Sequence, residues 1–235
     1  MVHKQLLTSV ILFIGIFFFG NKGLFSEEVY SWKDLDSVLE KIESANAEFK
    51  TLKADIVYTR TITLLEFTEI SEGKIRYKKP KKLYVKFGPP RNEINIVDGK
   101  YVWVYHPAEK QVEKYEMEKN TQASHGVGFF EFGYGESVQA AKKNYTITLL
   151  DTKQVDKKRF YILALLPINK TSQYSDIRLW IEEGVWLPTR IELYESGGEV
   201  VNSIEFKNIT LNRGVSDKHF AFNPPRGVEV IEPLR

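Results

Sequence analysis

Residues 73–105 read GKIRYKKPKKLYVKFGPPRNEINIVDGKYVWVY, and apolar and polar side chains alternate along most of this stretch. Successive side chains of an extended chain point to opposite faces, so a period of two predicts β-strands with one apolar face. The residues Val97-Asp98-Gly99-Lys100 are typical of the tight turn of a hairpin. The stretch therefore predicts antiparallel strands that follow one another along the chain. Its regularly spaced apolar residues are Ile75, Tyr77, Leu83, Val85, Phe87, Ile94 and Ile96.

Similar segments occur on both sides of this stretch, separated by turn signals such as Glu183-Gly184 and Ser196-Gly197-Gly198. No helical pattern between them is long enough to join parallel neighbours, so we expect an antiparallel meander of about ten strands in one curved sheet. The further candidate strands are 52–58, 101–105, 112–117, 145–151, 159–166, 176–182, 189–194, 200–211 and 220–222.

One strong helix precedes the first strand. Apolar residues recur at three- and four-residue spacing from Leu35 to Phe49, which predicts an amphipathic helix with one buried stripe. Ser31 followed three residues later by Asp34 is typical of a helix start. We expect this helix to lie on an apolar face of the sheet. The stripe consists of Leu35, Val38, Leu39, Ile42, Ala45 and Phe49.

The N-terminus has the layout of a secretory signal: a short segment with Lys4, an apolar run over residues 6–20, and a polar exit. We expect cleavage near Ser26, with Gly23 as the alternative site and an uncleaved anchor as the other interpretation. Residues 27–235 would then form a single domain. Residues 1–26 hold two of the 33 basic residues and no acid, so 31 basic face 31 acidic residues in that domain, and a neutral exported domain is not expected to bind nucleic acid.

The groups that catalysis needs are mostly missing from the sequence. The chain has no cysteine, no G-x-S-x-G motif and no phosphate-binding loop. His106, His125 and His219 lie far apart and show neither the spacing nor the carboxylate partners of a metal site. An envelope hydrolase that uses Ser124 and His125 is a third-ranked alternative, because adjacent side chains do not easily face each other. We therefore expect no enzyme activity, metal or cofactor.

Apolar surface, in contrast, exceeds what the expected elements can cover. Residues 101–105 and 160–166 are apolar on both faces, although an antiparallel sheet usually keeps one face in water. A buried central strand explains each case singly, but one long helix leaves part of the sheet uncovered, with room for an apolar ligand. The glycine-rich segment 126–135, with aromatic residues between its glycines, is either a loop packed on the sheet or a movable apolar flap.

Positive charge is concentrated between Ser71 and Arg91, where eight cations face Glu72 alone. Alternation with apolar residues places most of these cations on one sheet face, which suits an acidic protein or anionic headgroups. Lysines that protect a sheet edge against strand addition are the alternative.

These motifs in this order resemble the periplasmic outer-membrane lipoprotein carrier family (LolA-type). The likeness covers residues 73–80, 83–85, 97–105 with Pro107 and Gln111, and the C-terminal stretch 217–230. It implies a mainly β fold with helices, an incomplete antiparallel β-barrel (half-barrel) covered by the N-terminal helix and lid segments. It also implies a monomeric periplasmic carrier. Acylated lipoproteins would pass from an inner-membrane ATP-driven transporter to a possible outer-membrane acceptor.

By position, the resemblance places Leu39, Leu83, Val85 and Trp103 in the lining or rim of an acyl-chain cavity. The family's lid-locking arginine falls on Lys79, with Arg76 nearby; lysine keeps the charge but loses the planar fork. A lipoprotein-sensing regulatory module on the same fold is the alternative function. The remaining residues expected in the lipid-binding lining are Leu35, Ile42, Phe87, Ile94, Ile96, Tyr101, Tyr105, Phe129 and Phe130.

Overall fold

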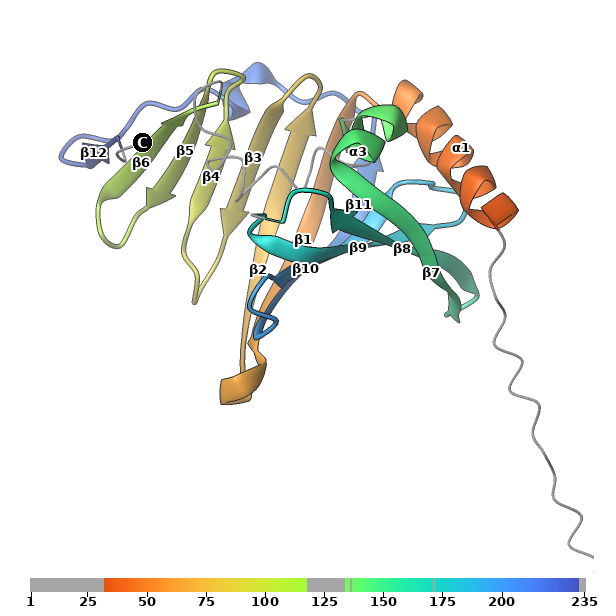
Figure 1. Ribbon diagram of the computed structural model, residues 1–235. Coiled ribbons are helices and arrows are strands. Elements are labelled where there is room, and N and C mark those ends of the chain that lie inside the picture. The colour runs from red at the N-terminus through yellow and green to blue at the C-terminus, as the bar shows by residue number, and fades with distance from the viewer. Residues whose placement is uncertain (1–31, 118–133, 136, 171, 233–235) are drawn as a thin grey trace, which may run out of the picture.

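The computed structural model describes residues 32–117, 134–135, 137–170 and 172–232 (Figure 1). The helices are α1 (Trp32–Glu48) and α3 (Val138–Asn144), and short 3-10 turns lie at η1 (Thr63–Leu65) and η4 (Asp217–His219). The strands are β1 (Thr51–Ile62), β2 (Phe67–Lys78), β3 (Lys82–Phe87), β4 (Ile94–Val97), β5 (Tyr101–His106), β6 (Gln111–Glu116), β7 (Tyr145–Val155), β8 (Lys158–Pro167), β9 (Tyr174–Glu182), β10 (Pro188–Glu195), β11 (Val200–Leu211) and β12 (Glu229–Ile231).

The strands form one twelve-stranded sheet in the order β12-β6-β5-β4-β3-β2-β1-β11-β10-β9-β8-β7. All its pairs are antiparallel except β12 with β6. The two ends of the order do not pair with each other, so the sheet curves without closing (Figure 1). The expectation of a helix-covered half-barrel is confirmed, with twelve strands in the described residues rather than about ten.

One predicted strand is wrong. Residues 220–222 pair with no strand, and β12 at the sheet edge forms later in the chain. The aromatic rings of Phe220 and Phe222 pack on the sheet instead, and Pro224 and Pro225 follow without backbone N–H groups to donate to a ladder.

The alternating pattern divides the sheet into two faces. On the inner face, defined here as the face that α1 covers, the register places Leu52 beside Tyr77 and Tyr77 beside Leu83. The apolar stripe of α1 is buried in the same core cluster. Just after α1, the ring of Phe49 stacks on Tyr77 with 5.6 Å between centroids. The predicted helix is therefore confirmed; Ser31, at its expected start, lies outside the described residues.

The opposite, outer face of β3–β6 is covered by residues 212–228, called here the C-terminal strap, before the chain joins the edge of the sheet as β12 (Figure 1). The ring of Phe222 lies 5.5 Å from Trp103 and 5.8 Å from Tyr105. Asp217 of the strap forms ion pairs with Lys78 at 3.0 Å and Lys82 at 2.9 Å. Residues 101–105 are apolar on both faces because each face has its own covering layer.

The positively charged residues lie where the alternation placed them. Lys74 pairs with Lys86, Arg76 with Tyr84, and Lys78 with Lys82, so these side chains share the outer face. The alternative of a lysine-protected edge is wrong, because β2 and β3 each pair with strands on both sides.

We predict that Gly73→Ala destabilises the fold. A Cβ at Gly73 would lie 2.5 Å from the backbone oxygen of Lys86 and 3.1 Å from Ile56 Cγ1, so neighbouring strands would have to separate. Such overpacking lowers the free energy of unfolding by about 1–3 kcal/mol, measurable by urea titration. Gly197→Ala is the matched control, because a Cβ there meets nothing within 4 Å. Equal stability of the two variants would contradict the prediction.

We also predict that acid loosens the strap. Hydrogen bonds from Lys82 and Lys78 hold the pKa of Asp217 below its ordinary value of 3.8. A depressed carboxyl pKa contributes stability above the unfolded-state pKa, and this contribution is lost as the pH falls through the lower folded-state pKa. The indole NMR signal of Trp103, which contacts Phe222, should therefore move below pH 3.8 in the wild type. In Asp217→Asn it should be displaced at neutral pH already; an unmoved signal there would refute the role of this pair.

Candidate functional site

The inner face carries a broad apolar surface, called here the apolar floor. It extends across β1, β2 and β3 and continues over β11 to β8. In this structure its side chains are covered by α1, Phe49 and Tyr134, and none is more than 8% exposed. The floor consists of Leu52, Ala54, Ile56, Ile75, Tyr77, Leu83, Val85, Phe87, Leu163, Leu165, Ile177, Leu179, Ile191, Leu193, Ile204 and Phe206.

Polar side chains border the floor on the same face. Tyr58 donates a hydrogen bond to Asn202 Oδ1 at 2.7 Å, and Asn202 Nδ2 donates to Glu195 Oε1 at 3.0 Å. Arg60 donates to the same Asn202 oxygen at 3.3 Å and pairs with Glu195 at 3.4 Å. Asn202 is only 6% exposed, so this hydrogen bonding satisfies polar groups that are withdrawn from water.

Arg91 joins this network from the β3–β4 connection. Its guanidinium carbon lies 4.5 Å from the ring centre of Tyr58 and 4.7 Å from that of Phe87. Its Nε and NH2 both donate to Glu93 Oε1, at 3.1 and 2.8 Å, and Asn95 Nδ2 donates to the same oxygen at 2.8 Å. Burial alone would lower the pKa of Arg91, but the interactions with Glu93 and Tyr58 together outweigh it, and the pKa lies above its ordinary value.

The network ends at β5 and β6. His106 lies between two carboxylates, with Nδ1 4.0 Å from Glu93 and Nε2 3.9 Å from Glu113. Tyr115 donates a hydrogen bond to Glu113, and burial raises the pKa of Tyr115 to about 12. The two carboxylates lie at ion-pairing distance from His106, a proximity that the sequence did not indicate. Residues Tyr58, Arg60, Arg91, Glu93, Asn95, His106, Glu113, Tyr115, Glu195 and Asn202 are called here the polar belt.

Residues 47–223 match the family model described as outer membrane lipoprotein carrier protein LolA. The chain belongs to the LolA family. An uncharacterized protein of Methanocaldococcus jannaschii, MJ0687, is 26% identical over 232 residues, which cover 98% of this chain but 61% of that relative. An outer-membrane lipoprotein carrier protein of Legionella pneumophila is 23% identical over 212 residues, 89% of this chain and 95% of that protein. The resemblance inferred from the sequence is thus confirmed.

A solved structure supports the LolA fold. An uncharacterized conserved protein from Thermus thermophilus superimposes with a TM-score of 0.54 over 85% of this chain and 99% of that chain. At 11% sequence identity the likeness concerns the fold alone.

The structure brings together six of the residues expected to bind lipid in this LolA-family chain. Leu35, Leu39 and Ile42 of α1 lie in the same buried cluster as Leu83, Val85 and Phe87 of the floor. Five others do not share that surface. Residues that lie opposite each other in neighbouring strands point to the same face. Tyr84 of the outer face lies opposite Ile96, and Ile96 lies opposite Trp103. Ile94 and Tyr105 lie opposite each other, two positions along the same strands, and therefore share that face. The five are Ile94, Ile96, Tyr101, Trp103 and Tyr105; Phe129 and Phe130 lie outside the described residues.

The two cations expected at the LolA lid also separate. Lys79 Nζ donates to the backbone oxygen of Asn46 in α1 at 2.6 Å and lies 5.4 Å from the ring centre of Phe49. Burial lowers the pKa of Lys79, while Glu43 of α1 opposes this shift. Arg76 instead lies on the outer face, with its guanidinium carbon 5.4 Å from the ring centre of Tyr84. Lys79 alone of the two therefore contacts the covering helix in the described structure.

The segment expected as a flap is described only at its end. Tyr134 is 1% exposed, packs against Phe49 and Phe206, and donates a hydrogen bond to the backbone oxygen of Pro188. Burial raises the pKa of Tyr134. Tyr134 is therefore packed in the core. Gly126, Phe132 and the candidate pair Ser124 and His125 lie outside the described residues.

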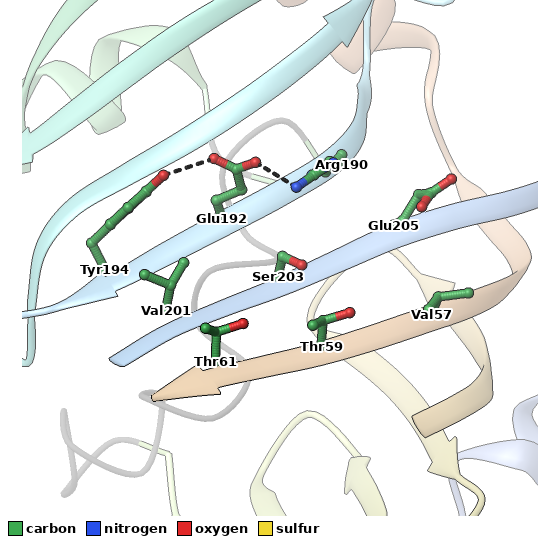
Figure 2. Close-up of a pocket in the computed structure, with 9 residues that line it drawn as sticks. All are labelled: Val57, Thr59, Thr61, Arg190, Glu192, Tyr194, Val201, Ser203 and Glu205. Carbon is green, nitrogen blue, oxygen red and sulfur yellow. Dashed lines mark hydrogen bonds and ion pairs between the residues drawn. The ribbon is translucent and has the colours of Figure 1, made fainter. Parts of the chain in front are cut away.

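A second, polar groove of about 250 Å³ lies on the outer face of β1, β10 and β11 (Figure 2). Three side chains of β10 interact along one wall of this groove: Glu192 pairs with Arg190 at 2.8 Å and accepts a hydrogen bond from Tyr194 at 3.1 Å. Hydroxyl and charged groups make this groove unsuited to acyl chains. Its lining consists of Val57, Thr59, Thr61, Arg190, Glu192, Tyr194, Val201, Ser203 and Glu205.

Within residues 32–117, 134–135, 137–170 and 172–232, no group of three or more metal-ligating side chains is arranged to hold an ion. Over the same residues, no helix has both the length and the apolar character needed to cross a bilayer.

Sequence reasoning missed most of the polar belt. Arg91 was grouped with the outer-face cations, although Pro89 and Pro90 interrupt the alternation before it. That break in phase is the signal that could have separated Arg91 from the lysines.

We predict that Arg91→Met lowers the free energy of unfolding by about 3 kcal/mol, because it leaves the buried Glu93 carboxylate without its cation. Urea titration measures this loss. The double variant Arg91→Met/Glu93→Gln should recover more than half of it, and the exposed Arg226→Met should change little. A double variant less stable than Arg91→Met would show that the pair is not the source of the effect.

Proposed function

We propose that this chain is a periplasmic carrier that holds the acyl chains of lipoproteins against the apolar floor and shuttles them from the inner to the outer membrane. The observation that carries the proposal is the floor itself: branched and aromatic side chains from neighbouring strands, bordered by a polar belt and covered by an amphipathic helix. Membership of the LolA family and the name of the Legionella pneumophila relative support the same function.

The energetics favour a mechanism in which acyl chains replace the α1 side chains on the floor. Each buried methylene group is worth about 0.8 kcal/mol, so acyl chains do not leave a membrane for water unaided. In the structure the stripe of α1 covers the floor. When α1 moves away, acyl chains can take the place of Leu35, Leu39 and Ile42. The apolar area withdrawn from water then changes little, and binding stays loose enough for release.

The polar belt sets which way the cargo lies. Acyl chains gain nothing from Arg91, Glu93 or Asn202, so they would end where the floor meets the belt. The ester and amide groups of a lipoprotein's modified N-terminus would then reach donors such as Arg60 and Arg91. This arrangement explains why buried polar groups border a surface that is otherwise apolar.

The proposed carrier has no phosphate-binding loop, so its energy must come from a partner. An ATP-driven transporter of the inner membrane would load it, and an acceptor at the outer membrane would take the cargo from it. The same floor would serve a sensor of mislocalised lipoprotein. Capture of the transporter rather than a signalling protein by the loaded chain distinguishes the carrier from that sensor.

The direct test is displacement of a fluorescent fatty-acid probe from the purified protein. We expect an acylated lipopeptide to displace the probe and its deacylated form to leave it bound, because only the acyl chains compete for the floor. Equal displacement by both peptides, or no probe uptake, would overturn the proposal.

A matched pair of variants sharpens this test. Lys79→Met removes the hydrogen bond to Asn46 in α1, a contact worth about 1 kcal/mol, and should tighten probe binding about fivefold by easing the release of the helix. Lys81→Met changes an exposed turn residue of the same type and should bind the probe like the wild type.

A further inference from the structure

The longest hairpin of the sheet ends in exposed apolar side chains. Residues 62–70, called here the hairpin tip, contain η1 and the facing ends of β1 and β2. The exposed fractions are 73% for Leu64, 69% for Leu65, 49% for Phe67 and 56% for Ile70. Four large apolar side chains exposed within seven residues are unusual for a surface turn and indicate an interaction site.

The hairpin tip projects beyond the body of the sheet. β1 and β2 pair along their full length, from Thr51 with Lys78 to Ile62 with Phe67. The next strand, β3, pairs only with residues 73–78 of β2, so the half of β2 nearest the tip has no partner on that side. In Figure 1 the orange turn of η1 extends below the neighbouring strands, away from α1, α3 and the C-terminal strap.

The backbone of the hairpin tip is closed by hydrogen bonds. The N–H of Thr63 donates to the oxygen of Glu199 at 2.8 Å, and the N–H of Glu66 donates to the oxygen of Thr63 at 3.2 Å. The paired residues Ile62 and Phe67 continue the ladder up to the turn. Insertion into hydrocarbon requires backbone polar groups that are satisfied internally. The groups named above meet that condition, whereas the edge of β2 before Gly73 has no partner strand, which limits insertion to the end of the hairpin.

The apolar side chains surround the tip rather than forming one face. Phe67 lies beside Ile62 on the inner side, Ile70 lies beside Thr59 on the outer side, and η1 presents Leu64 and Leu65 at the end. A protein groove would meet one side of such a hairpin, whereas a bilayer surrounds an inserted turn. Polar residues lie in the strands just behind the tip, where Arg60 pairs with Glu69 and Thr61 with Thr68. These residues would remain in the headgroup region, so the insertion is shallow.

The charge of the hairpin tip indicates which type of lipid surface it would contact. Glu66 and Glu69 lie in the hairpin tip, and Arg60, which lies opposite Glu69 in the ladder, is paired with Glu195 at 3.4 Å. The lysine-rich surface from Lys74 to Lys86 lies toward the opposite end of β2. A tip without excess positive charge gains nothing from anionic headgroups, so its chemistry fits a zwitterionic surface.

We infer that the hairpin tip docks this protein on zwitterionic bilayers by inserting Leu64, Leu65 and Phe67 at the level of the headgroups and first methylene groups. The inference goes beyond the proposed carrier function, because insertion needs no cargo and does not involve the apolar floor.

The absence of cysteine allows a positional test with the full chain. Leu65→Cys and, as a control of similar exposure, Ile168→Cys are each labelled with the fluorophore NBD and mixed with phosphatidylcholine vesicles that contain a spin-labelled lipid. We expect a blue shift and quenching at position 65 and neither at position 168. An apolar N-terminal run that binds the vesicle would not by itself quench position 65.

A second substitution tests the side chains. Leu64→Glu in the labelled Leu65→Cys chain should lower the quenched fraction about tenfold. The reason is that burial of one leucine side chain stabilises the inserted state by more than a tenfold change in membrane binding requires. Ile168→Glu in the same chain should leave it unchanged. No quenching at position 65, or quenching only with anionic lipid, would overturn the inference. Acyl-probe displacement reports separately on the carrier function, so either proposal can fail without the other.

Discussion

This structure depends on one constraint: the large open sheet carries apolar side chains on both faces, and both faces must be covered. Antiparallel sheets usually leave one face in water, but here β5 and β8, which lie near opposite ends of the strand order, are apolar on both faces. The inner face is covered by α1, whose stripe joins the core of the sheet, and the outer face of β3–β6 by the C-terminal strap. The two covers differ in kind. The strap is bound by the Asp217 ion pairs, whereas α1 is bound by its apolar stripe and by hydrogen bonds such as those from Lys79 to Asn46 and from Asn212 to Glu48.

That difference has a functional meaning within the LolA family. A carrier needs one apolar surface that stays closed and one that can be uncovered. The aromatic packing of Phe222 on Trp103 and Tyr105 belongs to the permanent layer. The contacts of α1 with the floor are apolar and non-directional, so in the proposed carrier acyl chains would replace them with little change in buried area. The polar belt stays in place during such an exchange, since Arg91, Glu93 and Asn95 come from the sheet and its loops.

Much of this arrangement could be predicted from the sequence, and the failures have physical causes. Period-two alternation located β2, β3 and the hairpin before β5, and the helical spacing located α1, because each has one polar face. Alternation could not decide which face of β5 points inward, since residues 101–105 are apolar at every position. Trp103 was placed in the lining by the family resemblance, whereas the register places it on the outer face. Arg91 was misplaced because the alternation of inner and outer side chains is interrupted at Pro89 and Pro90. The strand register, in which Leu83 lies opposite Val97, is needed to see which side chains face inward after this interruption. The half-open shape followed from the family resemblance rather than from any pattern of residues.

The central pairing of the sheet also governs how the chain can be made. β1 near the start of the fold pairs with β11 near its end, and Leu52 lies opposite Leu211. One meander of strands, β1 to β6, and another, β7 to β11, are joined only along this seam in the strand order. A chain emerging from a ribosome or a translocation channel thus cannot complete its centre until almost all of it has been delivered. Premature closure around a partial chain is thereby avoided, at the cost of slow, non-local folding.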